Sequence, residues 1–249
     1  SLSDCVVRAL GTTLTLNGTM DRAQNLNFKA VAQNVDLHRL PIKDETVDLN
    51  GNMSAEGALT GTLNQPLFSG RVTSKSFTVN GEEILNFKGS IVANGRDLNH
   101  IQGDCEQKAA NSDSFDSLYA VDLNLNREQR FLQGEVRVSY GNLKSLLKMG
   151  KVGYDIDGTV EGSITFNKQG KGSGIEADTY IYDVKLHNQK YYRMALQAHL
   201  KDRILYFDNV RLEEKEGQTD HGFIAVGGTI DLKNRQYKVE AGAVGANPA

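Results

Sequence analysis

The chain has 249 residues, a formal net charge of −3, a sequence pI near 6.0, 25 glycines and no tryptophan. No basic run supplies the lysines and arginines that neutralise phosphates, which excludes nucleic-acid binding. No stretch approaches the roughly 18 apolar residues of a transmembrane segment, and the first residues lack a signal-peptide pattern. We therefore expect a mature soluble protein or a segment of a longer one, forming one large β domain or two smaller ones.

Apolar and polar residues alternate along most of the chain. In the first half the alternation covers residues 14–16, 28–32, 47–53, 77–79 and 87–91, and in the second half 121–125, 136–138, 156–160, 194–198 and 230–232. A period of two indicates strands with one buried and one solvated face. Turn signals such as Asn80-Gly81 and Asn94-Gly95 separate the strands, so the fold class is all-β.

One or two short helices interrupt the strands. Leu143, Leu146 and Leu147 have helical spacing between Asn142 and Gly150, which predicts a helix over 142–149. Residues 35–40, which end before a proline, form a weaker counterpart.

The two helical segments belong to an internal repeat with an offset of 107 residues. This offset places Leu49 on Ile156 and Gly51 on Gly158, and the apolar phase persists although identity is low. Two β meanders can also align in phase by chance, but the shared turns and helical insert favour a true tandem. We divide it into residues 1–110, 111–217 and 218–249, the last being the start of a third unit or C-terminal strands, in one array without a linker.

A tandem of meanders predicts an elongated sheet. Roughly twenty strands at about 4.8 Å spacing give a length on the order of 100 Å. The sheet buries its apolar face by folding along its length into a half-pipe with an apolar concave groove. Cys5 and Cys105 would then lie about eight strands, or roughly 40 Å, apart, too far for a disulfide, and we interpret them as free or half-buried thiols.

One segment resembles a known family. Residues 57–70, GALTGTLNQPLFSG, followed by Arg71-Val72 and by residues 77–81, FTVNG, resemble the repeated signature of TamB and its AsmA-like relatives. The second unit departs from this signature, because a Lys/Gly-rich loop over 167–174 replaces the proline turn.

The resemblance implies a β-taco, a long folded sheet whose groove conducts phospholipid towards the outer membrane of double-membraned bacteria. It further implies a periplasmic location in the cell envelope, an inner-membrane anchor in the full-length protein, and an Omp85-type barrel as partner through regions not recognisable here. Outer-membrane integrity and assembly would depend on this transport.

The alternation assigns seventeen residues to the lining of the lipid groove. They are Leu49, Met53, Phe68, Val72, Phe77, Val79, Phe87, Ile91, Ile156, Val160, Ile164, Ile175, Val184, Leu186, Met194, Leu196 and Phe207. An ordinary closed β core would give the same alternation, so the sequence leaves open whether the groove is accessible.

Other functional classes find little support in the sequence. The five histidines lack metal-ligand spacing, residues 111–116 lack the glycine and the glutamate of a calcium loop, and no catalytic motif is present. We therefore expect no enzyme activity, metal or cofactor. The alternatives are a surface adhesin, for which the adjacent Tyr191 and Tyr192 are thin support, and a structural spacer without lipid cargo.

Overall fold

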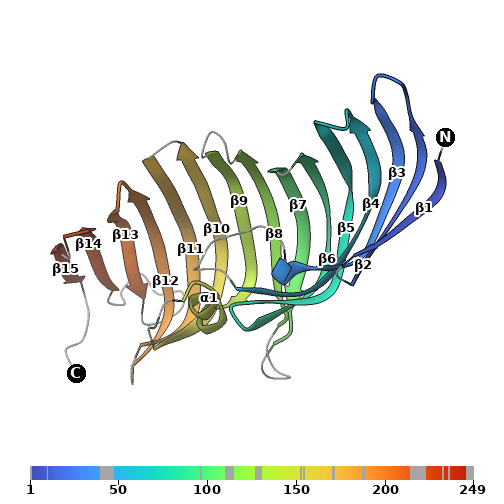
Figure 1. The fold of residues 1–249 in the computed structure, drawn as a ribbon. Helices are drawn as coiled ribbons and strands as arrows, with labels where there is room; N and C mark the ends of the chain where they lie inside the picture. Colours follow the sequence, from blue (N-terminus) through green and yellow to red (C-terminus); the bar gives the residue numbers. More distant parts are fainter. Residues whose placement is uncertain are drawn as a thin grey trace.

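The computed structural model describes residues 2–9, 11–39, 48–95, 97–109, 115–126, 131–151, 153, 155–169, 172–186, 189–213, 223–231, 233–234 and 236–244. These residues form a single antiparallel sheet in which every strand is hydrogen-bonded to its neighbours in sequence, so that β1 and β15 are the two edges. The strands follow one another along the length of the molecule (Figure 1), and the predicted all-β, elongated folded sheet is confirmed.

The fifteen strands range from 8 to 15 residues in length. They are β1 (Leu2–Ala9), β2 (Thr12–Met20), β3 (Leu26–Asp36), β4 (Leu49–Gly61), β5 (Pro66–Val79), β6 (Glu82–Asn94), β7 (Asp97–Gln107), β8 (Ser117–Asn126), β9 (Phe131–Asn142), β10 (Ile156–Gln169), β11 (Gly172–Leu186), β12 (Gln189–Lys201), β13 (Ile204–Glu213), β14 (Phe223–Asp231) and β15 (Gln236–Val244).

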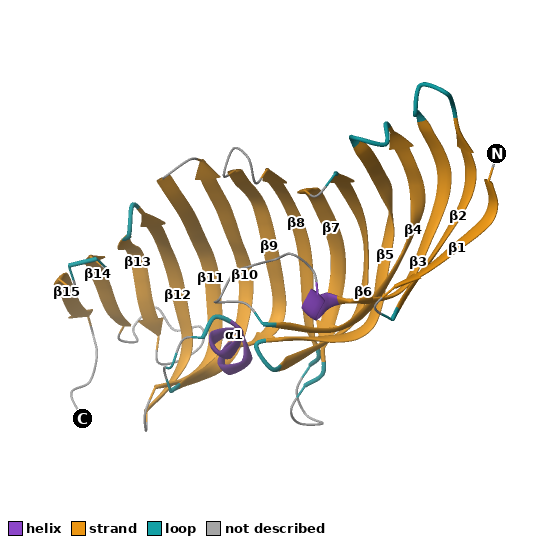
Figure 2. Cartoon of the chain, in the orientation of Figure 1, coloured by secondary structure: helices purple, strands orange, loops and turns teal. Residues whose placement is uncertain are grey.

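The predicted helix forms as α1 (Leu143–Met149). Asn142 caps its first turn, since the Asn142 side chain accepts a hydrogen bond from the Ser145 amide at 2.9 Å, and Gly150 follows its last residue. The weaker helical segment becomes a single 3-10 turn, η1 (Leu37–Arg39). Helix α1 lies in front of the sheet where the strands bend forward (Figure 2), and it contacts β6, β9 and β10.

The 107-residue offset also relates the observed elements. Shifting β6 by 107 gives residues 189–201, which are the bounds of β12, and shifting β4 gives 156–168 against 156–169 for β10. The 3-10 turn η1 shifts onto α1, so each helical element stands between equivalent strands. The sheet runs without interruption through these units, since β7 pairs with β8 from His100 to Gln107.

β-Bulges make the sheet bend. Strand register shifts between Ala32 and Val35 in β3, between Gly51 and Ser54 in β4, and again in β6, β9, β10, β11 and β13. Positive φ angles mark several of these places, namely Asn34, Gly51, Asn86, Tyr140, Gly158 and Asp183. A bulge bends its strand and increases the twist, so bulges in successive strands fold the whole sheet.

The bulges explain why the expected number of roughly twenty strands was too high. A bulge resets the alternation within a strand, so one long strand looks like two short ones in the sequence. In β3, for example, residues 28–32 alternate, and the phase then shifts before Val35. With fifteen strands at about 4.8 Å, the described sheet is about 67 Å long instead of 100 Å. Cys5 in β1 and Cys105 in β7 are six strands apart, not eight, and both thiols are free.

The hydrophobic core lies on the side of the sheet that α1 covers, which we call the inner face. Eight buried residues from β6 to β13 form one cluster, and Leu143, Leu146 and Met149 of α1 pack against it. The eight are Ile84, Tyr119, Val138, Val160, Ile181, Val184, Tyr191 and Leu212. Gly141 allows the close approach of the helix, since a Cβ at this position would lie 3.2 Å from Leu146 Cδ1 and 2.3 Å from Val138 Cγ1.

Candidate functional site: the inner face of the sheet

A continuous row of directly paired residues crosses the inner face from one edge of the sheet to the other. We call it the apolar row, and each of its fifteen members is apolar or glycine. The members are Val7, Leu14, Ala32, Ala55, Val72, Gly89, Gly103, Val121, Val136, Ile164, Ala177, Ala198, Phe207, Gly228 and Val239. Residues paired across antiparallel strands share a face, so the row runs along the length of the molecule.

The neighbouring row on the outer face has the opposite character. From Glu56 in β4 it continues through Arg71, Ser90, Gln102, Asp122, Glu135, Thr165, Glu176, His199, Tyr206, Thr229 and Lys238. Ion pairs span this face, for instance Lys29 with Glu56 at 2.7 Å. From β4 to β15 the two rows therefore differ in polarity, as the alternation predicts.

Strand pairing places all seventeen of the predicted lining residues on the inner face. Val72, Ile164 and Phe207 belong to the apolar row itself, and Leu49, Val79, Ile156 and others lie toward α1. Phe77 and Phe87 approach each other edge to face, with ring centroids 6.3 Å apart. Their contact with lipid stays a prediction.

Solvent access to the inner face varies along the sheet. Val72 and Val184 are only 1% exposed, and Val184 belongs to the cluster against which α1 packs. Towards the edges the inner face opens, with Met20 on β2 47% exposed and Tyr237 on β15 79% exposed. Twelve of the fifteen residues of the apolar row are half-buried or exposed. An apolar surface that reaches solvent over this length is typical of a binding surface.

The sequence analysis missed six of the eight residues of the inner cluster: Ile84, Tyr119, Val138, Ile181, Tyr191 and Leu212. A bulge brings residues three apart onto the same face, as with Ile84 and Phe87 around Asn86. Asp183 lies in the same way between Ile181 and Val184. Asn and Asp tolerate positive φ, so Asn86 and Asp183 are the residues from which these two bulges could have been predicted.

A chain of polar contacts lies on the inner face beneath α1. Tyr119 donates to Gln107 at 3.0 Å, Gln107 donates to Glu82 at 3.0 Å, and Lys148 of the helix donates to Glu82 at 2.5 Å. Burial raises the pKa of Glu82, but hydrogen bonds from Lys148, Ser145 and Gln107 outweigh it and hold that pKa below its ordinary value.

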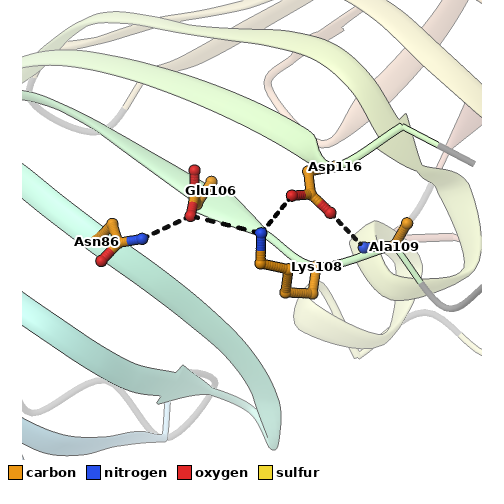
Figure 3. Close-up of polar contacts among 5 residues, drawn as sticks. All are labelled: Asn86, Glu106, Lys108, Ala109 and Asp116. Carbon is orange, nitrogen blue, oxygen red and sulfur yellow. Dashed lines mark hydrogen bonds and ion pairs between the residues drawn. The ribbon is translucent and has the colours of Figure 1, made fainter. Parts of the chain in front are cut away.

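A second polar network ties the bulge in β6 to the connection before β8 (Figure 3). Asn86 donates to Glu106, and Lys108 pairs with both Glu106 and Asp116. The other oxygen of Asp116 accepts the Ala109 amide at 3.0 Å. The Asp116 carboxylate, which ends the stretch similar to a calcium loop, is thus neutralised by a lysine. Residues 111–114 lie outside the described residues.

Histidines and cysteines occupy scattered places. His100 pairs with Asp122 at 2.9 Å and His199 with Asp208 at 2.6 Å on the outer face, whereas His187 and His221 lie outside the described residues. Burial and the nearby Asp104 raise the pKa of the Cys105 thiol to about 11, so this thiol stays protonated. Within the described ranges no group of three metal-ligating side chains occurs.

No family model, curated protein or solved structure matches this chain. Among the described residues no helix combines the length and hydropathy that a membrane span requires. The apolar inner face, which runs the length of the sheet and reaches solvent at Met20 and Tyr237, is the strongest candidate site.

Proposed function

We propose that this chain conducts phospholipid acyl chains along the inner face of its sheet. It would be a segment of a lipid-transport protein that spans the periplasm between the inner and outer membranes of double-membraned bacteria. The observation that carries the proposal is the apolar row, which continues through all fifteen strands without a charged or hydrogen-bonding side chain.

The energetics of an acyl chain suit such a row. Each CH₂ group removed from water contributes about 0.8 kcal/mol, so a chain lying along several strands is held firmly. Because the row offers no polar side chain, movement from one strand to the next neither makes nor breaks a hydrogen bond. Lipid would therefore bind without being fixed at one depth.

The wider setting rests on the resemblance of residues 57–81 to the TamB and AsmA-like family. An inner-membrane anchor, an Omp85-type barrel as partner and a role in outer-membrane assembly follow from that resemblance. The anchor, the barrel partner and the role in assembly are not based on the apolar row or on any other feature of the sheet.

The main rival is a structural spacer whose interior is filled by its own side chains, and the cluster beneath α1 favours it locally. An adhesin has weaker support. Tyr191 is buried in the inner cluster, whereas the adjacent Tyr192 contacts Tyr182 with ring centroids 6.4 Å apart. The two tyrosines therefore do not form one aromatic platform.

Photo-crosslinking in cells tests the proposal. A crosslinking amino acid at Met194, on the inner face, is expected to capture lipid, whereas the same group at Ala195, on the outer face, is not. Both positions lie in β12 and perturb the same strand pairing. If the Met194 probe captured no lipid in a folded protein, the spacer would be the better description.

Charge substitution provides the second arm. Met194→Asp and Phe87→Asp are expected to abolish lipid capture and transport, because a carboxylate on the inner face must lose its hydration when a lipid passes. The matched control is Ala195→Asp, whose carboxylate would face Arg211 across the pair between β12 and β13. Circular dichroism of each variant separates loss of the fold from loss of transport.

A further inference from the structure

We propose that a cleft between α1 and the ends of β4 and β5 binds the phosphate group of a lipid whose acyl chain lies on the inner face. This inference rests on the proposed function, since it names the part of the lipid that the apolar row does not contact. Its ligand chemistry is a phosphodiester with a single negative charge.

The cleft has the size and composition of a binding site for a small polar group. Its volume is about 540 Å³, within the usual range for ligand pockets. Three lysines line it together with one apolar side chain, one carboxylate and one amide: Lys144, Lys148, Lys151, Leu147, Asp48 and Asn80.

The helix brings the lysines together. Lys144 and Lys148 are four residues apart, so they lie on the same side of α1, and Lys151 follows directly after the helix. The other side of the helix carries Leu143, Leu146 and Met149, which pack on the inner cluster. The amphipathic helix therefore holds its cationic side towards the cleft.

Asn80 holds the opposite wall of the cleft in place. Its side-chain amide donates to the Met149 carbonyl at 2.5 Å, and its side-chain oxygen accepts the Asp48 amide at 2.7 Å. A backbone bond from Asn80 to the Asp48 carbonyl at 2.8 Å adds to this. The turn after β5, the start of β4 and the end of the helix are thus joined before any ligand binds, which lowers the entropic cost of binding.

The charges fit a phosphodiester. Three lysines and one carboxylate line the cleft, and Lys148 also pairs with Glu82 on the inner face. A phosphodiester carries one negative charge and several acceptor oxygens, which suits lysines placed as point charges around it. Lys148, in the last turn of α1, also interacts favourably with the helix dipole, and the test must separate this role from binding.

The cleft adjoins the inner face. Asp48 and Asn80 are the sequence neighbours of Leu49 and Val79, which pair directly on the inner face. The next inner pair is Gly51 with Phe77, where a Cβ on the glycine would lie 2.8 Å from Phe77 Cβ, so Phe77 packs closely over Gly51. A lipid with its phosphate in the cleft would therefore lay its acyl chain over Leu49 and Val79.

The test measures binding of two soluble lipids to the whole chain by isothermal titration calorimetry. One is a short-chain phosphatidylglycerol and the other is the diacylglycerol with the same acyl chains, which lacks the phosphate. We expect the triple variant Lys144→Gln, Lys148→Gln, Lys151→Gln to lose about tenfold or more in affinity for phosphatidylglycerol, as befits charge-assisted hydrogen bonds. Its affinity for diacylglycerol should not change.

The control variant, Lys88→Gln, Lys190→Gln, Lys201→Gln, removes three exposed lysines from the outer side of the sheet and changes the net charge equally. It should bind both lipids as the wild type does. The conservative variant with arginine at positions 144, 148 and 151 should retain phosphatidylglycerol binding, and circular dichroism of all variants should show an unchanged fold.

Each other outcome overturns the inference in a distinct way. An equal loss in both lysine variants would indicate a general charge effect, and tight binding of inorganic phosphate alone would indicate a site for the free anion. If both lipids bound and replacing the three lysines changed neither affinity, the cleft would be rejected as the phosphate site, but the proposed function would stand. If neither lipid bound, both the phosphate site in the cleft and the proposed function would be rejected.

Discussion

At the scale of single residues, Glu82 is the unusual member of the inner face. It carries a charge where its neighbours Phe77 and Ile84 are apolar, and only 15% of its side chain is exposed. A carboxylate in such a place is tolerated because Lys148 and Gln107 donate to both of its oxygens. Since Lys148 comes from the helix, the charge of Glu82 links the docking of α1 to the protonation state of one residue.

This link predicts a pH-dependent stability. The pKa of Glu82 is lowered from 4.5 in the folded protein, so its contribution to stability is complete above about pH 4.5 and is lost as the pH falls through the lower folded value. Glu82→Gln should reduce the free energy of unfolding by about 1–3 kcal/mol at pH 7. The difference from wild type should shrink at pH 3, as measured by urea denaturation.

Glu83→Gln serves as the control, because Glu83 lies next in sequence but is exposed on the outer face. It should leave stability nearly unchanged at both pH values. A Glu82→Gln effect that was equal at pH 7 and pH 3 would contradict the linkage.

At the scale of elements, the bulges decide how each strand contributes to the fold. Strand β3 presents Leu26, Phe28, Ala30 and Ala32 inward by simple alternation and then resumes with Val35. The reset occurs at Asn34, whose φ of 57° is in the left-handed region. Asparagine adopts this region more readily than β-branched residues, so the residue type at the bulge matters for the bend.

Substitution at Asn34 tests this role. Asn34→Val should destabilise the protein by about 1–2 kcal/mol, because a β-branched side chain is strained at this φ, whereas Asn34→Gly should be close to neutral. Asn27→Val on the outer side of the same strand should be neutral or slightly stabilising, since its backbone is extended. Thermal unfolding of the three variants gives the comparison, and equal effects of valine at both positions would argue against a bulge at Asn34.

At the scale of the whole molecule, the sheet is elongated because each strand pairs only with its neighbours in sequence. Elongation leaves an inner face that is exposed on the edge strand β15, is covered beside α1, and is buried again on β3, where Phe28 is 5% exposed. Edge strand β15 is exposed along its length, so the apolar row reaches solvent there. This shape suits the movement of a ligand along the molecule better than the enclosure of a single ligand.

Small-angle X-ray scattering tests the shape. Fourteen intervals of about 4.8 Å give a sheet about 67 Å long, so the maximum dimension should be at least about 70 Å. A compact protein of this length would have a radius of gyration near 18 Å. The measured radius should be clearly larger, and a value of about 18 Å would contradict the open sheet.

The faces of the strands could be predicted because alternation is a local property. Leu49 to Val79 and Ile156 to Leu186 keep their phase through the 107-residue offset, and strand pairing places them on one face. Helix α1 was equally predictable, since its leucine spacing and both of its caps lie within nine residues.

The sequence by itself therefore determined which side chains share a face and where the helix forms. Only the tertiary structure decided which face is concave, how many strands the alternating segments make, and where the helix docks. Lys148 meets Glu82 from 66 residues away, and Asn80 meets Met149 from 69. Such contacts depend on the bulges, which reset the phase of the bulged strands and thereby bend the sheet.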